Sequence, residues 1–179
     1  EPSLLAMKRQ ITLAQTRQLI HDIRAKVPGI AIRTTFLVGF PGETEEDFEV
    51  LCDFVKEMRF ERLGVFQYSH EEDTSAFLSK DNVPDEIKAE RAQRLMEIQQ
   101  EISLELNHAK IGKIYKVLID KKESGFYYGR TEFDSAEVDN EVIIDASSNY
   151  CSIGGFVDVL IEDATEYDLI GNVIDLNPN

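Results

Sequence analysis

The 179-residue sequence has no tryptophan, two cysteines and three histidines. Cys52 and Cys151 stand far apart, and His21, His70 and His108 share no metal-ligand spacing, so the sequence suggests no metal centre. Two isolated cysteines are typical of buried thiols in a reducing compartment, and we therefore expect a cytoplasmic protein. No apolar run approaches the roughly 20 residues that span a bilayer, so no membrane partner is expected.

Basic residues are also scarce. The chain has 19 Lys and Arg residues against 34 Asp and Glu residues, a formal net charge of −15. Such a surface disfavours general nucleic-acid binding and favours a basic partner, or simply solubility. Residues 111–179 hold five basic and fourteen acidic residues, a net charge of −9, whereas residues 1–110 carry −6. The last third of the chain is therefore the more acidic part.

The pattern of residues 1–110 predicts alternating helices and strands. Apolar periodicity places helices at 13–27, 45–59 and 84–110 and strands at 30–38 and 63–68. Thr12 and Gln15 resemble a capping box at the first helix, and Thr44 can cap the second. Because each strand is followed by a helix, the order implies right-handed, parallel β/α units. The exposed edge of so small a sheet makes a dimer through strand pairing plausible.

The rhythm changes after residue 110. Short strand-like segments lie at 114–119, 126–130, 141–144, 156–161 and 169–174, separated by Gly, Asn, Asp and Ser. Five such segments predict a small closed barrel of the OB type. We therefore expect a domain boundary near residue 111, with an α/β domain at 1–110 and an all-β domain at 111–179.

The most informative stretch is RTTFLVGFPGET at residues 33–44. It predicts a strand, a tight turn and a helix start, which is where parallel sheets bind ligands. Phe36 to Val38 are apolar without alternation, which favours a strand covered on both faces. Gly39 and Gly42 allow backbone geometries that a Cβ would block, and Pro41 fixes one dihedral of the turn.

Several long motifs point to a known family. RTTFLVGFPGET, GVFQYS at 64–69 and RLMEIQQEIS at 94–103 resemble the last part of a radical S-adenosylmethionine barrel in methylthiotransferases, and residues 111–179 resemble a TRAM domain. The tracts YYGRTEFDSAEVDNEV at 127–142 and EDATEYDLIGNVI at 162–174 are most similar to the RimO branch. That branch methylthiolates an aspartate of a small-subunit ribosomal protein.

The resemblance implies a partial radical S-adenosylmethionine (β/α) barrel, with two parallel strands and three helices, followed by a five-stranded TRAM barrel. It also implies S-adenosylmethionine and two 4Fe–4S clusters in the parent protein, since an unactivated C–H bond requires radical chemistry. The family's C-x-x-x-C-x-x-C loop is missing from this sequence. The chain therefore looks like a carboxy-terminal piece, and we expect it neither to hold a stable cluster nor to turn over alone.

The resemblance also implies cofactor-binding residues. Leu37 and Gly39 match the strand that contacts the adenine side of S-adenosylmethionine, and Tyr68 ends the next strand. Arg33 and Thr35 lie on the same strand face by period two. Arg33 could hold a carboxylate of cofactor or substrate, or form a structural ion pair. Plain strand propensity explains Thr35 better than a binding role does.

The acidic tract at 134–141 lacks the residue order of a calcium-binding EF-hand loop and by default is a solvated loop. The sharper hypothesis is that Asp134, Glu137, Asp139 and Glu141 dock the basic ribosomal protein.

Two other functions stay open. A tRNA methylthiotransferase would share the architecture, but RNA-binding barrels need basic grooves and stacking aromatics, and a barrel of charge −9 has the wrong sign. A non-enzymatic acidic module for protein interaction would need no cofactor at all.

Overall fold

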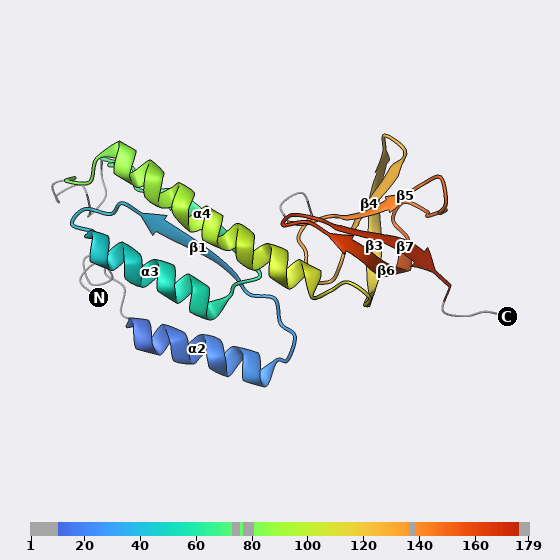
Figure 1. Ribbon diagram of the computed structural model, residues 1–179, viewed down its shortest axis with the longest axis horizontal. Coiled ribbons are helices and arrows are strands. Elements are labelled where there is room, and N and C mark those ends of the chain that lie inside the picture. The colour runs from blue at the N-terminus through green and yellow to red at the C-terminus, as the bar shows by residue number, and fades with distance from the viewer. Residues whose placement is uncertain (1–10, 73–75, 77–80, 137–138, 176–179) are drawn as a thin grey trace. The chain divides into compact units, whose positions relative to one another are not determined.

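The computed structural model describes residues 11–72, 76, 81–136 and 139–175 (Figure 1). The chain divides into two compact units, residues 1–102 and 103–179. The helix α4 (Asp85–His108) begins in the first unit and ends in the second.

The first unit contains the helices α2 (Leu13–Lys26) and α3 (Glu45–Met58) and the strands β1 (Arg33–Val38) and β2 (Arg62–Gln67). The two strands pair in parallel, which confirms the predicted two-stranded remnant. β1 begins at Arg33 rather than at residue 30. One reason is that the Ile32 N–H donates 2.8 Å to Glu61 Oε2, a side chain, instead of to a neighbouring strand.

Both helix starts in this unit are capped as the sequence predicts. Thr12 Oγ1 accepts from the Gln15 N–H at 3.2 Å, and Gln15 Oε1 accepts from the Thr12 N–H at 2.9 Å. Thr44 and Asp47 make the same reciprocal pair at the start of α3, with both distances 3.1 Å. Each cap satisfies backbone donors that the helix itself leaves unpaired, which stabilises a helix by about 1 kcal/mol.

One face of the small sheet packs against helices. Ile20, Phe54, Met58 and Phe60 form a buried cluster that Phe36 of β1 joins through edge-to-face ring contacts at 6.2 and 5.9 Å. Exposure alternates along β1, with every second residue from Arg33 on the open face. The expectation of a strand covered on both faces is therefore wrong for this chain, because the described helices that contact it lie on the Phe36 side.

The second unit is a closed five-stranded barrel, as predicted. Its strands are β3 (Ile114–Glu123), β4 (Phe126–Arg130), β5 (Val142–Asp145), β6 (Phe156–Ala164) and β7 (Leu169–Ile174). They follow the order β3-β4-β5-β7-β6 around the barrel. β3 and β6 run beyond their predicted ends because a register shift in each, after Ile119 and Ile161, breaks the apolar alternation while the pairing continues.

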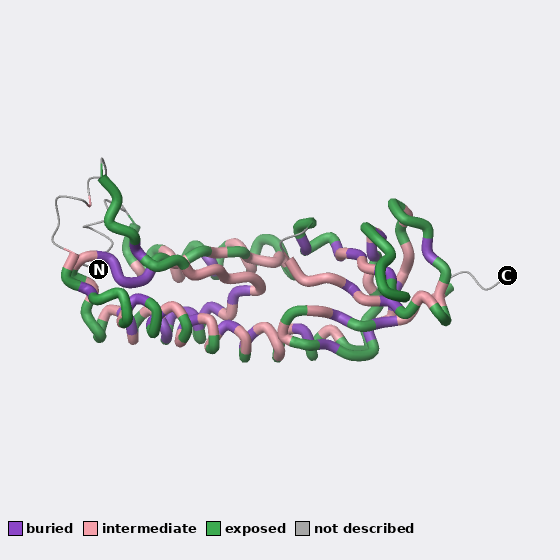
Figure 2. Tube along the Cα trace, turned by 90° about the horizontal axis from the view of Figure 1, so that it is seen from above, coloured by how far each residue is buried: buried purple, intermediate pink, exposed green. Residues whose placement is uncertain are grey.

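Inward-facing side chains fill the barrel. Val117, Ile119, Val159 and Ile161 are fully buried, and the residues between them along each strand are more exposed. Figure 2 shows this as purple stretches interrupted by pink and green ones. Two glycines make the packing possible. A Cβ at Gly129 would lie 2.5 Å from the Leu118 carbonyl oxygen, and one at Gly171 would lie 2.3 Å from the Leu160 carbonyl oxygen.

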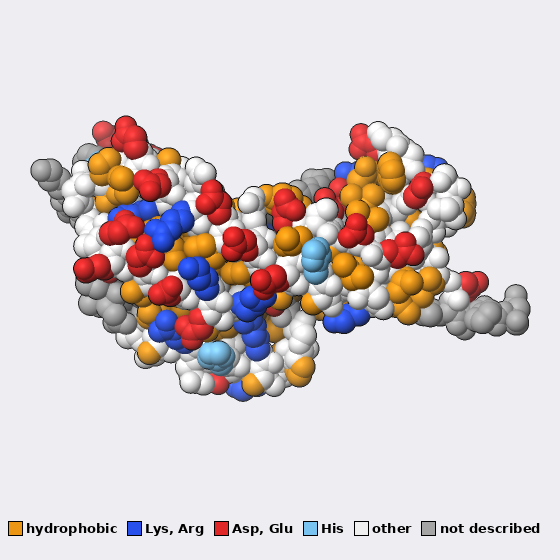
Figure 3. All heavy atoms as spheres, in the orientation of Figure 1, with side chains coloured by type: hydrophobic (Ala, Val, Ile, Leu, Met, Phe, Trp, Pro, Cys, Tyr) orange, Lys and Arg blue, Asp and Glu red, His pale blue; other side chains and the backbone are white. Residues whose placement is uncertain are grey.

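The surface differs between the units. Over the helices of the first unit, red and blue side chains lie next to one another, whereas red side chains lie among orange ones on the visible face of the barrel (Figure 3). Within the described ranges, no helix has both the length and the apolar character to cross a bilayer.

The close approach at Gly171 predicts that Gly171→Ala destabilises the barrel by about 1–3 kcal/mol through overpacking. Hydrogen–deuterium exchange with mass spectrometry reports each unit separately and should show faster exchange in barrel peptides only. Gly64→Ala is the matched control, since its Cβ would make only an ordinary 3.8 Å contact with Thr35 Oγ1. Barrel exchange unchanged by Gly171→Ala would contradict the tight contact.

Candidate functional site

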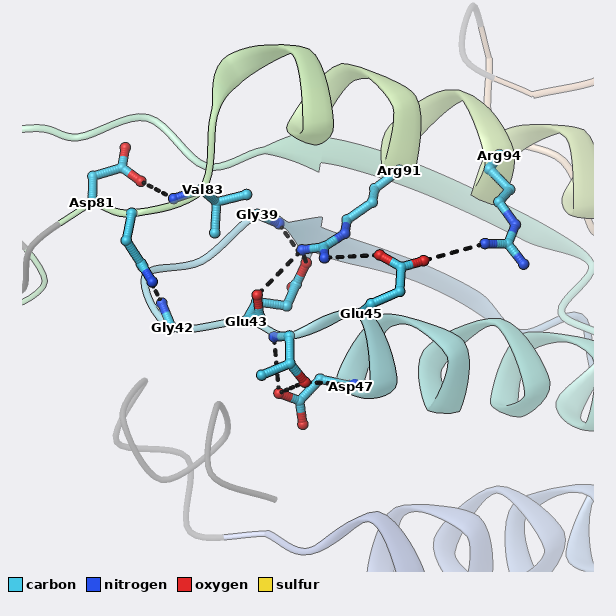
Figure 4. A network of polar contacts seen from close by, with 11 residues as sticks. Gly39, Gly42, Glu43, Glu45, Asp47, Asp81, Val83, Arg91 and Arg94 are labelled. Carbon is cyan, nitrogen blue, oxygen red and sulfur yellow. Dashed lines mark hydrogen bonds and ion pairs between the residues drawn. The ribbon is translucent and has the colours of Figure 1, made fainter.

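The turn that follows β1 is held by two side chains, one just before α3 and one just before α4. Gly39 and Gly42 have φ angles of 76° and 85°, a left-handed conformation that side chains disfavour. The Gly39 N–H donates to Glu43 Oε1 at 2.9 Å, and the Gly42 N–H donates to Asn82 Oδ1 at 2.8 Å. Figure 4 shows the bond from Gly39 to Glu43, which lies within the turn, whereas the bond from Gly42 to Asn82 joins the turn to the segment that leads into α4. Two backbone N–H groups of this turn therefore donate to side-chain acceptors.

A buried ion pair connects the turn to α4. Arg91 Nη1 lies 2.7 Å from Glu43 Oε1, and their side chains are only 7% and 8% exposed. Arg91 Nη2 reaches Glu45 Oε2 at 3.0 Å (Figure 4). Sequence reasoning missed Arg91, although a signal was present. Arg91 lies one helical turn from both Ile87 and Leu95, inside the apolar stripe of α4. A charge in such a stripe requires a buried partner.

Lys88 occupies the space that Gly39 leaves open. A Cβ at Gly39 would lie 2.3 Å from Lys88 Cγ, so the lysine stem passes directly over the glycine. The Lys88 ammonium binds Asp81 Oδ2 at 2.7 Å and Asp85 Oδ1 at 3.1 Å, and it lies 5.5 Å from the centre of the Tyr68 ring. The absence of a side chain at Gly39 thus has a structural cause, whether or not a ligand binds nearby.

Asp81 and Lys88 each favour the charged form of the other. The hydrogen bond from Lys88 lowers the pKa of the Asp81 carboxyl below its ordinary 3.8. The same bond raises the pKa of the Lys88 ammonium above 10.5. The stabilisation from Asp81 is therefore lost only as pH falls through its lowered pKa, and that from Lys88 only as pH rises through its raised pKa. Both groups stay charged across the physiological range.

The open face of the sheet presents an apolar surface at its carboxyl end. Leu37 of β1 and Phe66 of β2 are register partners, and their exposed fractions are 38% and 67%. Thr35 is on the same face, beside Gly64. Phe66 was not among the predicted site residues, although the parallel register that pairs it with Leu37 follows from the predicted strands.

The other predicted cofactor-binding residues are divided between the two ends of β1. Tyr68 lies beside Gly39 at the carboxyl end. Its backbone N–H donates 2.9 Å to the Val38 carbonyl, and its hydroxyl lies 3.1 Å from His70 Nδ1. Arg33 opens β1 and pairs in register with Arg62. At about 3.3 Å per residue it starts roughly 13 Å from Leu37. Leu37, Gly39 and Tyr68 are thus brought together, and Arg33 is not.

The predicted docking acids are largely engaged within the barrel. Asp134 is buried, and its Oδ2 accepts from Thr131 Oγ1 at 2.6 Å. Asp139 accepts from the Ser135 N–H at 2.8 Å, and Glu141 pairs with Lys121 at 3.0 Å.

The fourth predicted acid, Glu137, lies outside the described residues. A docking role for the acidic tract remains a prediction.

The two cysteines do not suit an iron–sulfur cluster. Cys52 is buried in the first unit and Cys151 in the second. Burial raises the pKa of both thiols, so each stays protonated at neutral pH and is a poor thiolate ligand. Among the residues that the structure describes, no group of three or more His, Cys, Asp or Glu side chains could hold a metal ion.

Residues 111–174, the barrel, match the TRAM domain family. The whole chain is similar to proteins named ribosomal protein uS12 methylthiotransferase RimO. It is 55% identical to that of Flavobacterium johnsoniae, over 94% of this chain and 38% of the relative. It is 54% identical to that of Cytophaga hutchinsonii and 49% to that of Bacteroides thetaiotaomicron, in both cases over 96% of this chain and 39% of the relative. The chain thus spans about two fifths of the length of these relatives.

The contact between Gly39 and Lys88 predicts different effects of alanine at the two turn glycines. Gly42→Ala meets no atom within 4 Å and should cost only the left-handed strain, about 1–2 kcal/mol. Gly39→Ala has the same strain and also strikes Lys88, so it should cost about 1–3 kcal/mol more. Lys88→Ala combined with Gly39→Ala should recover that difference in a double-mutant cycle of urea unfolding. Equal costs at the two glycines would argue against the contact.

Arg91→Met should destabilise the first unit by about 3–5 kcal/mol, because it leaves the Glu43 carboxylate buried without its cation. Urea unfolding followed by far-ultraviolet circular dichroism measures this, since the described helices lie mainly in the first unit. Arg94→Met on the same helix is the matched control. Its partner Glu49 is 46% exposed, so the change should be much smaller. A similar loss from both variants would show that the buried pair has no special weight.

Proposed function

By sequence this chain belongs with the RimO ribosomal protein uS12 methylthiotransferases, and we propose that it forms part of such an enzyme. The proposed reaction of the whole protein adds a methylthio group to the β-carbon of an aspartate in uS12. In that enzyme this chain supplies one wall of the cofactor site and the TRAM barrel. The observation that carries the proposal is the exposed sheet face, on which Leu37 and Phe66 lie in register at the ligand-binding end of parallel strands.

The open face suits the adenine part of S-adenosylmethionine. A flat aromatic group gains most from packing against apolar side chains, and Leu37 with Phe66 offers such a surface. Gly39 and Tyr68 lie at the carboxyl end of this surface. There Lys88 packs over Gly39, and Arg91 bonds to Glu43 in the turn. When bound in the whole enzyme, the cofactor would supply a radical for abstracting hydrogen from carbon. The role of this chain's residues is to bind and orient, which alone can lower a barrier by several kcal/mol.

The iron–sulfur clusters do not fit this chain. A three-cysteine loop would be needed, and the sequence has two buried, separated cysteines. We therefore propose that the clusters are held by other parts of the whole protein and that this chain is inactive alone. Reconstitution of the 179-residue chain with iron and sulfide, followed by absorption spectroscopy, checks this. A stable cluster spectrum would refute it.

The acidic barrel supports a ribosomal protein, rather than RNA, as the partner. Its net charge of −9 opposes the phosphate backbone and favours a basic protein, mainly by speeding encounter. A tRNA methylthiotransferase and a non-enzymatic acidic module are the competing functions. Action on a ribosomal protein would place the enzyme in the cytoplasm.

We expect that, in a full-length protein containing this sequence, Leu37→Ser lowers methylthiolation of uS12 about tenfold, since one lost apolar contact in a binding site has roughly that effect. Arg33→Ala should also lower it if Arg33 holds a carboxylate. Mass spectrometry of uS12 measures the product, and the KM for S-adenosylmethionine shows whether cofactor binding is affected.

Val50→Ser is the control, because Val50 is 48% exposed on α3, outside the proposed site. Native activity in Arg33→Ala would remove Arg33 from the site. Native activity in Leu37→Ser would contradict the proposed cofactor wall. No product with the native protein would contradict the proposed reaction itself.

A further inference from the structure

The Lys88 side chain has two parts with different contacts. Its ammonium binds the Asp81 carboxylate at 2.7 Å and the Asp85 carboxylate at 3.1 Å. The Lys88 side chain is 5% exposed and that of Asp81 22%, whereas that of Asp85 is 92% exposed, so Asp81 is the stronger anchor. The charge of Lys88 is thus balanced within the described residues, before any ligand binds.

The stem of Lys88 supports the backbone of Gly39. The three atoms nearest to a Cβ built at Gly39 are Lys88 Cγ, Cβ and Cδ, at 2.3, 3.1 and 3.1 Å. All three belong to the stem, so the contact does not involve the ammonium. A lysine stem loses much rotamer freedom when it is fixed, and the bond to Asp81 at its far end offsets that loss.

A second contact from the same helix also reaches Gly39. The Gly39 N–H donates to Glu43 Oε1, and this oxygen accepts from Arg91 Nη1 at 2.7 Å. Lys88 and Arg91 are three residues apart on α4, so they lie on one face of the helix. That face of α4 therefore fixes the backbone at Gly39, two residues after Leu37, where the open surface of the sheet ends.

We infer that Lys88 is a positioning residue for S-adenosylmethionine, and that it acts through its stem rather than through its charge. The stem keeps the Gly39 backbone in its left-handed conformation at the end of the apolar surface of Leu37 and Phe66. The inference rests on the proposed function, because it requires that this surface receives the adenine. A cavity in place of the stem would let the turn relax, and a displaced backbone binds a ligand less well even when every contact residue is still present.

The test separates the stem from the charge with two variants of a full-length protein containing this sequence. Lys88→Met keeps a stem and removes the charge, whereas Lys88→Ala removes both. Isothermal titration calorimetry with S-adenosylhomocysteine measures binding without the radical reaction. Lys88→Ala should weaken this binding about tenfold, within the roughly hundredfold that a 1 Å misplacement can cost. Lys88→Met should stay within about threefold of the native affinity, since it keeps the packed volume.

Two further measurements separate positioning from general damage to the fold. Hydrogen exchange of the Gly39 amide, followed by nuclear magnetic resonance in the 179-residue chain, should be faster in Lys88→Ala and native-like in Lys88→Met. The affinity of the full-length variants for recombinant uS12 should stay within about twofold of native, the range of near-neutral changes. Lys56→Ala is the matched control, since it removes an exposed lysine from the last turn of α3 and should change none of these values.

Native affinity for S-adenosylhomocysteine in Lys88→Ala would overturn this inference and leave the proposed function standing, because the native protein would still bind the analogue. Equal weakening by Lys88→Met would overturn it by showing that the ammonium, and not the stem, determines binding. Equally weakened binding of uS12 in Lys88→Ala would show general damage and would also overturn it. If the native protein does not bind S-adenosylhomocysteine, the proposed cofactor surface fails and this inference fails with it.

Discussion

The first unit depends on one buried contact, the ion pair between Arg91 of α4 and Glu43 at the end of the turn. Glu43 has two tasks, since the oxygen that binds Arg91 also accepts the Gly39 N–H. A left-handed glycine, a carboxylate and a helix are therefore joined at one atom. Both charges are removed from water. Displacing either one would leave the other buried without a counter-charge, at a large cost in free energy. The turn that shapes the carboxyl end of the sheet is fixed by electrostatics as much as by packing.

Local signals in the sequence were sufficient for most of the fold. Thr12 with Gln15 and Thr44 with its acidic first turn predicted both helix starts, because caps involve residues three apart. Five short segments of alternating polarity predicted the barrel, because the alternation of side chains along a strand is also a local signal. The two long strands were underestimated, since a bulge reverses the alternation on which the prediction relied. A prediction from periodicity therefore ends the strand at the bulge.

The site was less accessible, because its contacts are made through space. Gly39 was correctly marked as special, yet the neighbour that requires it, Lys88, is 49 residues later in the sequence. The single-strand pattern could place Leu37 on a face, but the partner that enlarges this apolar surface, Phe66, comes from the register of a second strand. The burial of Asp134 was not visible in the sequence either, since its bond to Thr131 is seen only in the structure. Composition cannot distinguish a carboxylate that meets solvent from one that is already bonded.

The two barrel glycines have a consequence for how such domains can be found. Gly129 and Gly171 occupy positions where a backbone carbonyl lies within 2.5 Å of the place a Cβ would take. Most positions in a small barrel tolerate exchange among apolar residues, provided that volume is kept. A side chain at either position destabilises the barrel, because the obstacle is the main chain of the adjoining strand. In barrels of this architecture whose sequences have diverged elsewhere, the two glycines would keep their places in the strand alternation. Their spacing would then identify the closed barrel from sequence.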